Sequence, residues 1–303
     1  HIIAADLAEQ LTHETMFADV NAVSGFVNFK FSDAFLDTFT TQALKSAENY
    51  AKSENGKKIL IEYVSANPTG PLHIGHARGA VYGDTLVRVG RHLGYDITAE
   101  YYVNDAGNQI DNLGLSVLYA GKNLFLEGDY EIPEGCYKGE YINDVATNAK
   151  EVFGITIFEP ENPSPELMVW AKDEMLTLIK SNLNDAGIIF DTFVSEKEVF
   201  TVWDEVRRDL ESKSALYTEE EKVFLKSSEH GDTHDRVVVR DNGIPTYLAG
   251  DIVYHDQKFK RGYDHYINIW GADHHGYITR VKSAVNHLGH DSEKLEIILS
   301  QMV

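Results

Sequence analysis

Two histidines three residues apart, His73 and His76, follow a turn that is rich in proline and glycine. The turn comes after an apolar run, residues 59–64, that is typical of a buried strand, and a helix is expected next. The first amides of a helix in this position attract phosphate, and Gly75 lets a nucleotide lie against the backbone. We therefore expect His73 and His76 to stabilise charge on a phosphoryl group under attack.

The H-x-G-H spacing is by itself a weak signal in a chain with 13 His and 23 Gly, because surface or core histidines can adopt it by chance. Its context makes the interpretation stronger. A strand-like run precedes it, a turn follows that run, and helical sequence begins at the histidines, which is the arrangement that phosphate chemistry at a sheet edge requires.

The elements that must position these residues alternate between strand and helix. Strands are expected at 59–64 and 97–103, and helices at 73–93 and 106–119. The same order returns later, at 237–239, 247–259, 266–270, 274–288 and 295–303. This pattern predicts an α/β fold, a Rossmann-like parallel sheet with helices on both faces.

Two segments break the alternation. Residues 1–52 contain an alternating, strand-like run, Phe26–Phe31, followed by helical sequence, and we expect them to form a small leading unit. Residues 121–165 contain clustered proline, glycine and acidic residues, and the sequence that follows, to about residue 235, mixes helical stretches such as 166–185 with short strand-like stretches such as 222–225. We interpret them as an α+β subdomain inserted into a sheet domain that spans 58–303.

Composition limits the class of protein. Hydrophobic residues make up 43% of the 303 residues, which is typical of a globular fold, and no window has the ~18 apolar residues of a membrane helix. Cys136 is the only cysteine, so no disulfide forms within the chain, which suits the cytoplasm. The net charge of −21 opposes broad binding to a phosphate backbone, so a nucleic-acid partner needs a local patch or another domain.

Several longer runs resemble a known family. Residues 66–76, which read ANPTGPLHIGH, are similar to the signature of class I aminoacyl-tRNA synthetases in its arginyl-tRNA synthetase form. The runs 62–65, 101–109, 246–252 and 270–277 also resemble bacterial members of that family. The resemblance implies an arginine–tRNA ligase that uses ATP, with Mg²⁺ accompanying the nucleotide, to activate L-arginine as an adenylate and to transfer it to tRNA-Arg.

The resemblance also implies roles for single residues. The implied catalytic residues are His73, His76 and Asn67. The implied ATP contacts are His73, Gly75, His76, Gly271 and Asp273. The implied arginine contacts are Glu62, Ser65, Asn67, His76, Tyr247 and Asp251.

The chemistry of arginine agrees with these roles. A planar guanidinium with five donors calls for carboxylates that accept paired hydrogen bonds, as Glu62 and Asp251 could. Tyr247 and Asp251 are four residues apart and therefore share one helix face. An ordinary helix start with an acidic first turn would also contain such residues. Asn104 and Asp105 suit either the edge of a pocket or the cap of a helix.

The sequence departs from the family pattern in two ways. Ala272 stands where many arginyl enzymes have a glutamine that contacts arginine, and the lysine-rich K-M-S-K-S loop does not occur. The chain also lacks an initiator methionine and stops on an apolar run. We therefore expect a catalytic-domain fragment. The resemblance implies that residues 1–52 end an N-terminal tRNA-binding domain, and that the lysine-rich loop and an anticodon-binding domain, which make most tRNA contacts, follow residue 303.

Two other functions stay open from the residues alone. A small-molecule nucleotidyltransferase shares the H-x-G-H device, and a non-catalytic module that binds arginine or a nucleotide would keep the same pocket. No metal site, and no zinc site in particular, is expected, because the adjacent His274 and His275 do not converge easily on one ion beside Asp273.

Overall fold

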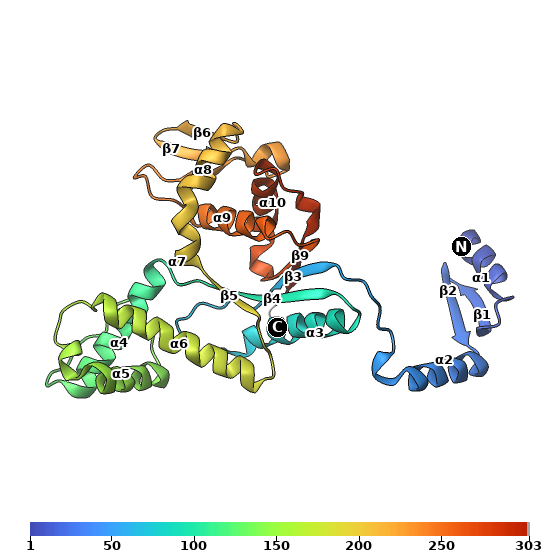
Figure 1. Cartoon of the computed structure of the whole chain (residues 1–303), viewed down its shortest axis with the longest axis horizontal. Coiled ribbons are helices and arrows are strands. Elements are labelled where there is room, and N and C mark those ends of the chain that lie inside the picture. The colour runs from blue at the N-terminus through green and yellow to red at the C-terminus, as the bar shows by residue number, and fades with distance from the viewer. Residues whose placement is uncertain (302–303) are drawn as a thin grey trace. The chain divides into compact units, whose positions relative to one another are not determined.

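The computed structural model describes residues 1–301, apart from the side chain of Asp273, and divides into two compact units, residues 1–54 and the residues from Asn55 onward (Figure 1). In the first unit, helix α1 (Ile2–Leu11) packs on a hairpin of β1 (Phe17–Val23) and β2 (Phe26–Phe31). Helix α2 (Asp33–Ser46) and a short 3₁₀ helix (Ala47–Asn49) follow. The strand expected at 26–31 is confirmed, and the Ser32 side chain caps α2.

The second unit contains a five-stranded sheet in which every neighbouring pair is parallel, in the order β10-β9-β3-β4-β5. This confirms the α/β fold. The strands are β3 (Lys58–Glu62), β4 (Asp96–Val103), β5 (Thr192–Ser195), β9 (His265–Gly271) and β10 (Leu295–Ser300).

Helices cover both faces of this sheet, as Figure 1 shows. Side chains alternate along β3, so Ile61 packs with helices α3 (Ile74–His92) and α6 (Pro165–Asp185). Leu60 points to the opposite face, where it packs with α9 (Tyr247–Lys260) and α10 (Ile278–His287). The helices expected at 73–93, 166–185, 247–259 and 274–288 are therefore present, with α10 beginning a few residues late.

The segment between β4 and β5 is helical and has its own core. Helices α4 (Asn108–Phe125) and α5 (Glu140–Phe153) pack with α6 around buried residues such as Leu118 and Phe158. After β5 the chain forms α7 (Glu196–Val199), α8 (Trp203–Ser212) and an antiparallel sheet of β6 (Leu216–Glu219), β7 (Lys222–Leu225) and β8 (Arg236–Val239). Every helix in the described chain is too short or too polar to cross a bilayer.

One strand assignment made from the sequence is wrong, and one strand of the parallel sheet was missed. Residues 237–239 do not resume the parallel sheet, because β8 pairs antiparallel with β7. The parallel sheet is instead re-entered earlier, by β5, which pairs with β4 and lies within the segment 121–235 that we interpreted as an inserted subdomain. A four-residue strand is too short for its periodicity to reveal which sheet it joins.

Candidate functional site

A pocket of about 460 Å³ lies at the carboxyl ends of the parallel strands. This is where ligands bind in open parallel sheets, and the volume is typical of a small-molecule site. We call it the carboxylate pocket because Glu62, Glu196 and Asp251 all line it. Its other lining residues are Val64, Ser65, Asn67, Tyr102, Asn104, Tyr247, Tyr254, His255, Ile269, Trp270, Gly271, His274 and Tyr277.

The turn after β3 forms one wall of the pocket in a strained conformation. Val64 and Ser65 have φ angles of 68° and 43°, a left-handed region that costs a side-chain-bearing residue about 1–3 kcal/mol. The end of β4 holds the turn: the Tyr102 amide donates to Ser65 Oγ at 3.1 Å, and Asn104 Nδ2 donates to the Ser65 carbonyl at 3.1 Å. These bonds fix the backbone that carries Asn67 to the pocket.

Glu62 lies in the pocket wall, as its predicted role requires, but both of its oxygens already have partners. Ser65 Oγ donates to one oxygen at 3.0 Å, and Lys258 Nζ donates to the other at 2.5 Å. The residue is only 5% exposed. Its negative charge is therefore balanced by a buried cation of α9.

Asp251 faces the same pocket with no cation of the described chain paired to it. Burial raises the pKa of its carboxyl group to about 7; a hydrogen bond from Tyr277 opposes this rise, and the charges of Glu62 and Glu196 add to it. Burial and the charge of Asp105 likewise raise the pKa of Glu196 to about 7. Two carboxyl groups that resist ionisation in one pocket favour a cationic ligand.

Glu196 is a pocket residue that the sequence interpretation missed, and Asp105 holds it in position. The Asp105 carboxylate accepts hydrogen bonds from Ser195 Oγ at 2.8 Å and from the Lys197 amide at 3.0 Å, one on each side of Glu196. Neither Asn104 nor Asp105 caps α4, whose first residue is Asn108. The signal that could have revealed Glu196 is its place directly after a strand of the parallel sheet, which required β5 to be recognised.

Other pocket residues were within reach of sequence reasoning. Tyr254 and His255 lie three and four residues after Asp251 and so share its helix face. Trp270 directly precedes Gly271 at the end of β9, and Tyr277 lies six residues after Gly271. The spacing of side chains on α9 therefore predicts part of the wall of the carboxylate pocket, which the H-x-G-H motif alone does not predict.

His73 and His76 cap the start of α3 reciprocally. The Gly75 amide donates to His73 Nδ1 at 3.1 Å, and the His73 amide donates to His76 Nδ1 at 3.3 Å. Because both Nδ1 atoms accept, each neutral ring carries its proton on Nε2. Burial and the neighbouring His73 lower the pKa of His76, which favours this neutral form. The pair thus offers two N–H donors at a helix start.

The predicted site residues do not all lie in one cavity. Glu62, Ser65, Asn67, Tyr247, Asp251 and Gly271 line the carboxylate pocket, whereas His73 and His76 are not among its lining residues. The side chain of Asp273 lies outside the described residues.

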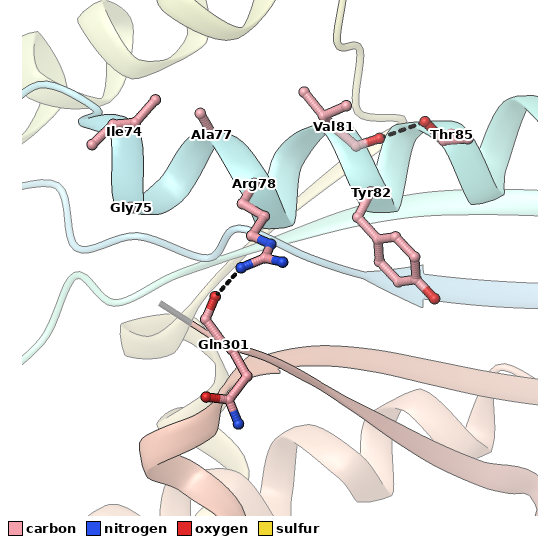
Figure 2. Close-up of a pocket in the computed structure, with 8 residues that line it drawn as sticks. All are labelled: Ile74, Gly75, Ala77, Arg78, Val81, Tyr82, Thr85 and Gln301. Atoms are coloured by element: carbon pink, nitrogen blue, oxygen red, sulfur yellow. Dashed lines mark hydrogen bonds between the residues drawn. The ribbon is translucent and has the colours of Figure 1, made fainter. Parts of the chain in front are cut away.

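Gly75 belongs to a second cavity of about 580 Å³ along α3, which we call the α3 groove and which is lined by Ile74, Gly75, Ala77, Arg78, Val81, Tyr82, Thr85 and Gln301. Figure 2 shows the Arg78 guanidinium directed at the Gln301 carbonyl, which it binds at 2.9 Å. The groove is largely apolar, so the carboxylate pocket remains the better candidate for polar recognition.

Known proteins are similar to almost the whole chain. Residues 40–302 match the family described as tRNA synthetases class I (R), catalytic domain. The chain belongs to this family. It is 53% identical to the arginine–tRNA ligase of Aliarcobacter butzleri over 303 residues, and 54% identical to that of Sulfurimonas denitrificans over 301 residues. These alignments cover 100% and 99% of the chain but only 57% of each relative, so the chain spans little more than half their length.

Solved structures agree with this membership. A crystal structure from Campylobacter jejuni, described as an arginyl tRNA synthetase, aligns with a TM-score of 0.84 at 54% identity, over 90% of this chain and 61% of that one. Thermus thermophilus arginyl-tRNA synthetase aligns with a TM-score of 0.65 at 18% identity, over 99% of this chain and 57% of that one, which supports the fold alone.

Proposed function

We propose that this chain is the catalytic part of an arginine–tRNA ligase, which joins L-arginine to tRNA-Arg through an arginyl-adenylate. The observation that carries the proposal is the carboxylate pocket, where Asp251 and Glu196 face the cavity without a cationic partner in the described chain. A guanidinium stays charged at every physiological pH and binds carboxylates through paired donors. Arginine is therefore the amino acid whose side chain fits this charge pattern.

In the proposed complex, Asp251 and Glu196 accept the guanidinium, and Tyr247 contacts the side chain from the same helix as Asp251. Glu62 forms the wall behind them. Ser65, Asn67 and His76 contact the amino and carboxylate groups of the amino acid. This places the arginine carboxylate at the strand ends, near the start of α3.

The nucleotide contacts follow from the helix start. We assign His73 and His76 to donate their Nε2–H groups to the phosphoryl oxygens of ATP, with Gly75, Gly271 and Asp273 as further ATP contacts. The carboxylate of arginine attacks the α-phosphorus, pyrophosphate leaves, and the adenylate then passes arginine to the terminal ribose of tRNA-Arg with release of AMP. Preorganised donors stabilise the charge that develops on the phosphoryl oxygens.

Mg²⁺ is proposed to arrive with the nucleotide. In the described part of the chain, no group of three or more His, Cys, Asp and Glu side chains is arranged to hold a metal ion. We therefore assign no protein ligand to it. We place the ligase in the cytoplasm and assign most tRNA contacts to domains other than this one; residues 1–52 are proposed to be the end of a tRNA-binding domain.

Calorimetric titration of the chain with L-arginine, L-lysine and L-citrulline tests the assignment. Citrulline has nearly the shape of arginine but a neutral end group, so it leaves the carboxylates unpaired. We expect arginine to bind at least about 100-fold more tightly than citrulline, because a buried unpaired carboxylate costs several kcal/mol. Equal binding of lysine or citrulline would contradict the assignment of specificity.

A further inference from the structure

Lys258 is the most deeply buried cation near the carboxylate pocket, yet it does not line it. Its side chain is fully buried, and Nζ lies 2.5 Å from Glu62 Oε2 and 2.8 Å from Asn268 Oδ1. The ammonium also lies 4.2 Å from the centroid of the Tyr254 ring, a favourable cation–π position. Lys258 therefore stands directly behind two residues of the pocket wall, Glu62 and Tyr254.

A chain of hydrogen bonds connects Lys258 back to Asp251. Asn268 accepts from Lys258 and donates through Nδ2 to His255 Nε2 at 2.9 Å. His255 Nδ1 then donates to the Asp251 carbonyl at 2.8 Å. Burial lowers the pKa of His255 to about 3, so the ring is neutral. Its Nε2 accepts from Asn268, and its single N–H, on Nδ1, therefore donates to the Asp251 carbonyl. Lys258 is thus connected to the pocket in two ways. It forms an ion pair with Glu62, and it is linked through Asn268 and His255 to the backbone of Asp251 on α9.

The charges around Asp251 show what the ammonium does there. Glu62 from β3, Tyr102 from β4 and Glu196 from α7 face it, as do His274 and Tyr277 after β9, and its own helix adds Tyr247, Tyr254, His255 and Lys258. Among these groups Lys258 is the one lysine or arginine, and its charge lowers the pKa of Asp251 while that of Glu62 raises it. Without Lys258, the three carboxylates that line the pocket would have no lysine or arginine among the groups that face Asp251.

We propose that Lys258 is a specificity-determining positioning residue, which neutralises Glu62 so that the substrate cation is received by Asp251 and Glu196. The proposal rests on the proposed recognition of arginine. A pocket with three free carboxylates would ionise only in part near neutral pH, and the cation could bind in more than one place. Because Glu62 is already paired with Lys258, the guanidinium has one placement left, between Asp251 and Glu196.

The test is the pH dependence of L-arginine affinity, measured by calorimetry on the chain from pH 6 to pH 9. Lys258→Met leaves Glu62 unpaired, so the pKa of Asp251 should rise and the midpoint of the affinity profile should move up by about one pH unit. At pH 7 binding should then weaken about fivefold, while at pH 9 most of the loss should be recovered. Lys260→Met is the matched control and should leave the profile unchanged, because Lys260 lies on the same helix but pairs with Asp256, which does not line the pocket.

The double variant Lys258→Met/Glu62→Gln separates this role from a merely structural one. It removes both members of the buried pair, which proteins tolerate better than the loss of one, so it serves even where the single variant does not fold. We expect its midpoint to return to within about 0.3 pH units of the unmodified chain. A profile lowered equally at every pH by Lys258→Met, or a double variant as weak as the single one, would overturn the role of Lys258 alone. Absence of arginine binding by the unmodified chain at any pH would overturn the proposed function as well.

Discussion

Asp251 and Glu196 should not contribute equally to binding. Asp251 lies among three pocket-lining residues of its own helix, whereas Glu196 comes from the short helix α7. We expect Asp251→Asn to weaken L-arginine binding by about 2–4 kcal/mol and Glu196→Gln by about 1–2 kcal/mol, measured by calorimetry. Glu198→Gln, an exposed position on α7, is the control and should change nothing. Equal affinity of Asp251→Asn and the unmodified chain would remove Asp251 from the site.

The raised pKa values predict how affinity varies with pH. The guanidinium keeps its charge, so binding requires the carboxylates to ionise, and each has its pKa raised to about 7. Affinity should be highest above pH 8 and should fall as pH drops through 7, approaching about tenfold per pH unit for each carboxylate involved. An affinity that is flat from pH 6 to pH 8 would contradict this electrostatic account.

The same pKa shift predicts that Asp251 lowers the stability of the ligand-free protein. Its carboxyl ionises more easily in the unfolded chain than in the folded one, so folding stability falls as pH rises from about 4 to about 7 and does not recover above that. We expect Asp251→Asn to raise the melting temperature at pH 8 and to leave it nearly unchanged at pH 4. Thermal denaturation at the two pH values measures this, and a lower melting temperature at pH 8 would contradict it.

At the scale of elements, the packing of α3 on the sheet determines where His73 and His76 lie. A Cβ on Gly83 would meet Tyr63 Cγ at 2.3 Å, and Tyr63 is fully buried and cannot move aside. We expect Gly83→Ala to destabilise the chain by about 1–3 kcal/mol through overpacking. Gly79→Ala on the same helix meets nothing within 4 Å and should stabilise it by up to about 1 kcal/mol. Urea denaturation compares the two, and similar effects would show that α3 is not tightly packed.

The sequence predicted long elements better than short ones. The helix at 166–185 and the strand at 97–103 were found almost to the residue, because their apolar periodicity extends over several turns or alternations. The strand at 237–239 was found but placed in the wrong sheet, since its partner β7 is decided by tertiary contacts. The missed role of β5 explains the missed Glu196, because residue type alone does not mark a carboxylate as part of a pocket.

At the scale of the whole molecule, the pocket belongs to the second unit alone. Residues 1–54 form a separate compact unit, in which Ala4 and Ala8 are the buried hydrophobic residues. We expect a chain of residues 55–303 to bind L-arginine with an affinity within about twofold of the whole chain, because compact units usually keep their own sites. Calorimetry on both chains tests this, and a tenfold loss would show that the first unit contributes to the site.

The strained turn at Val64 and Ser65 also has a consequence for protein engineering. Glycine would adopt these backbone angles without the same strain, so selection for heat resistance alone would favour replacing Val64. The side chains present have other roles: Val64 lines the carboxylate pocket, and Ser65 holds both Glu62 and the end of β4. A variant library screened only for thermostability should therefore accumulate changes at this turn that loosen the pocket, and such a screen needs ligand present to retain a functional site.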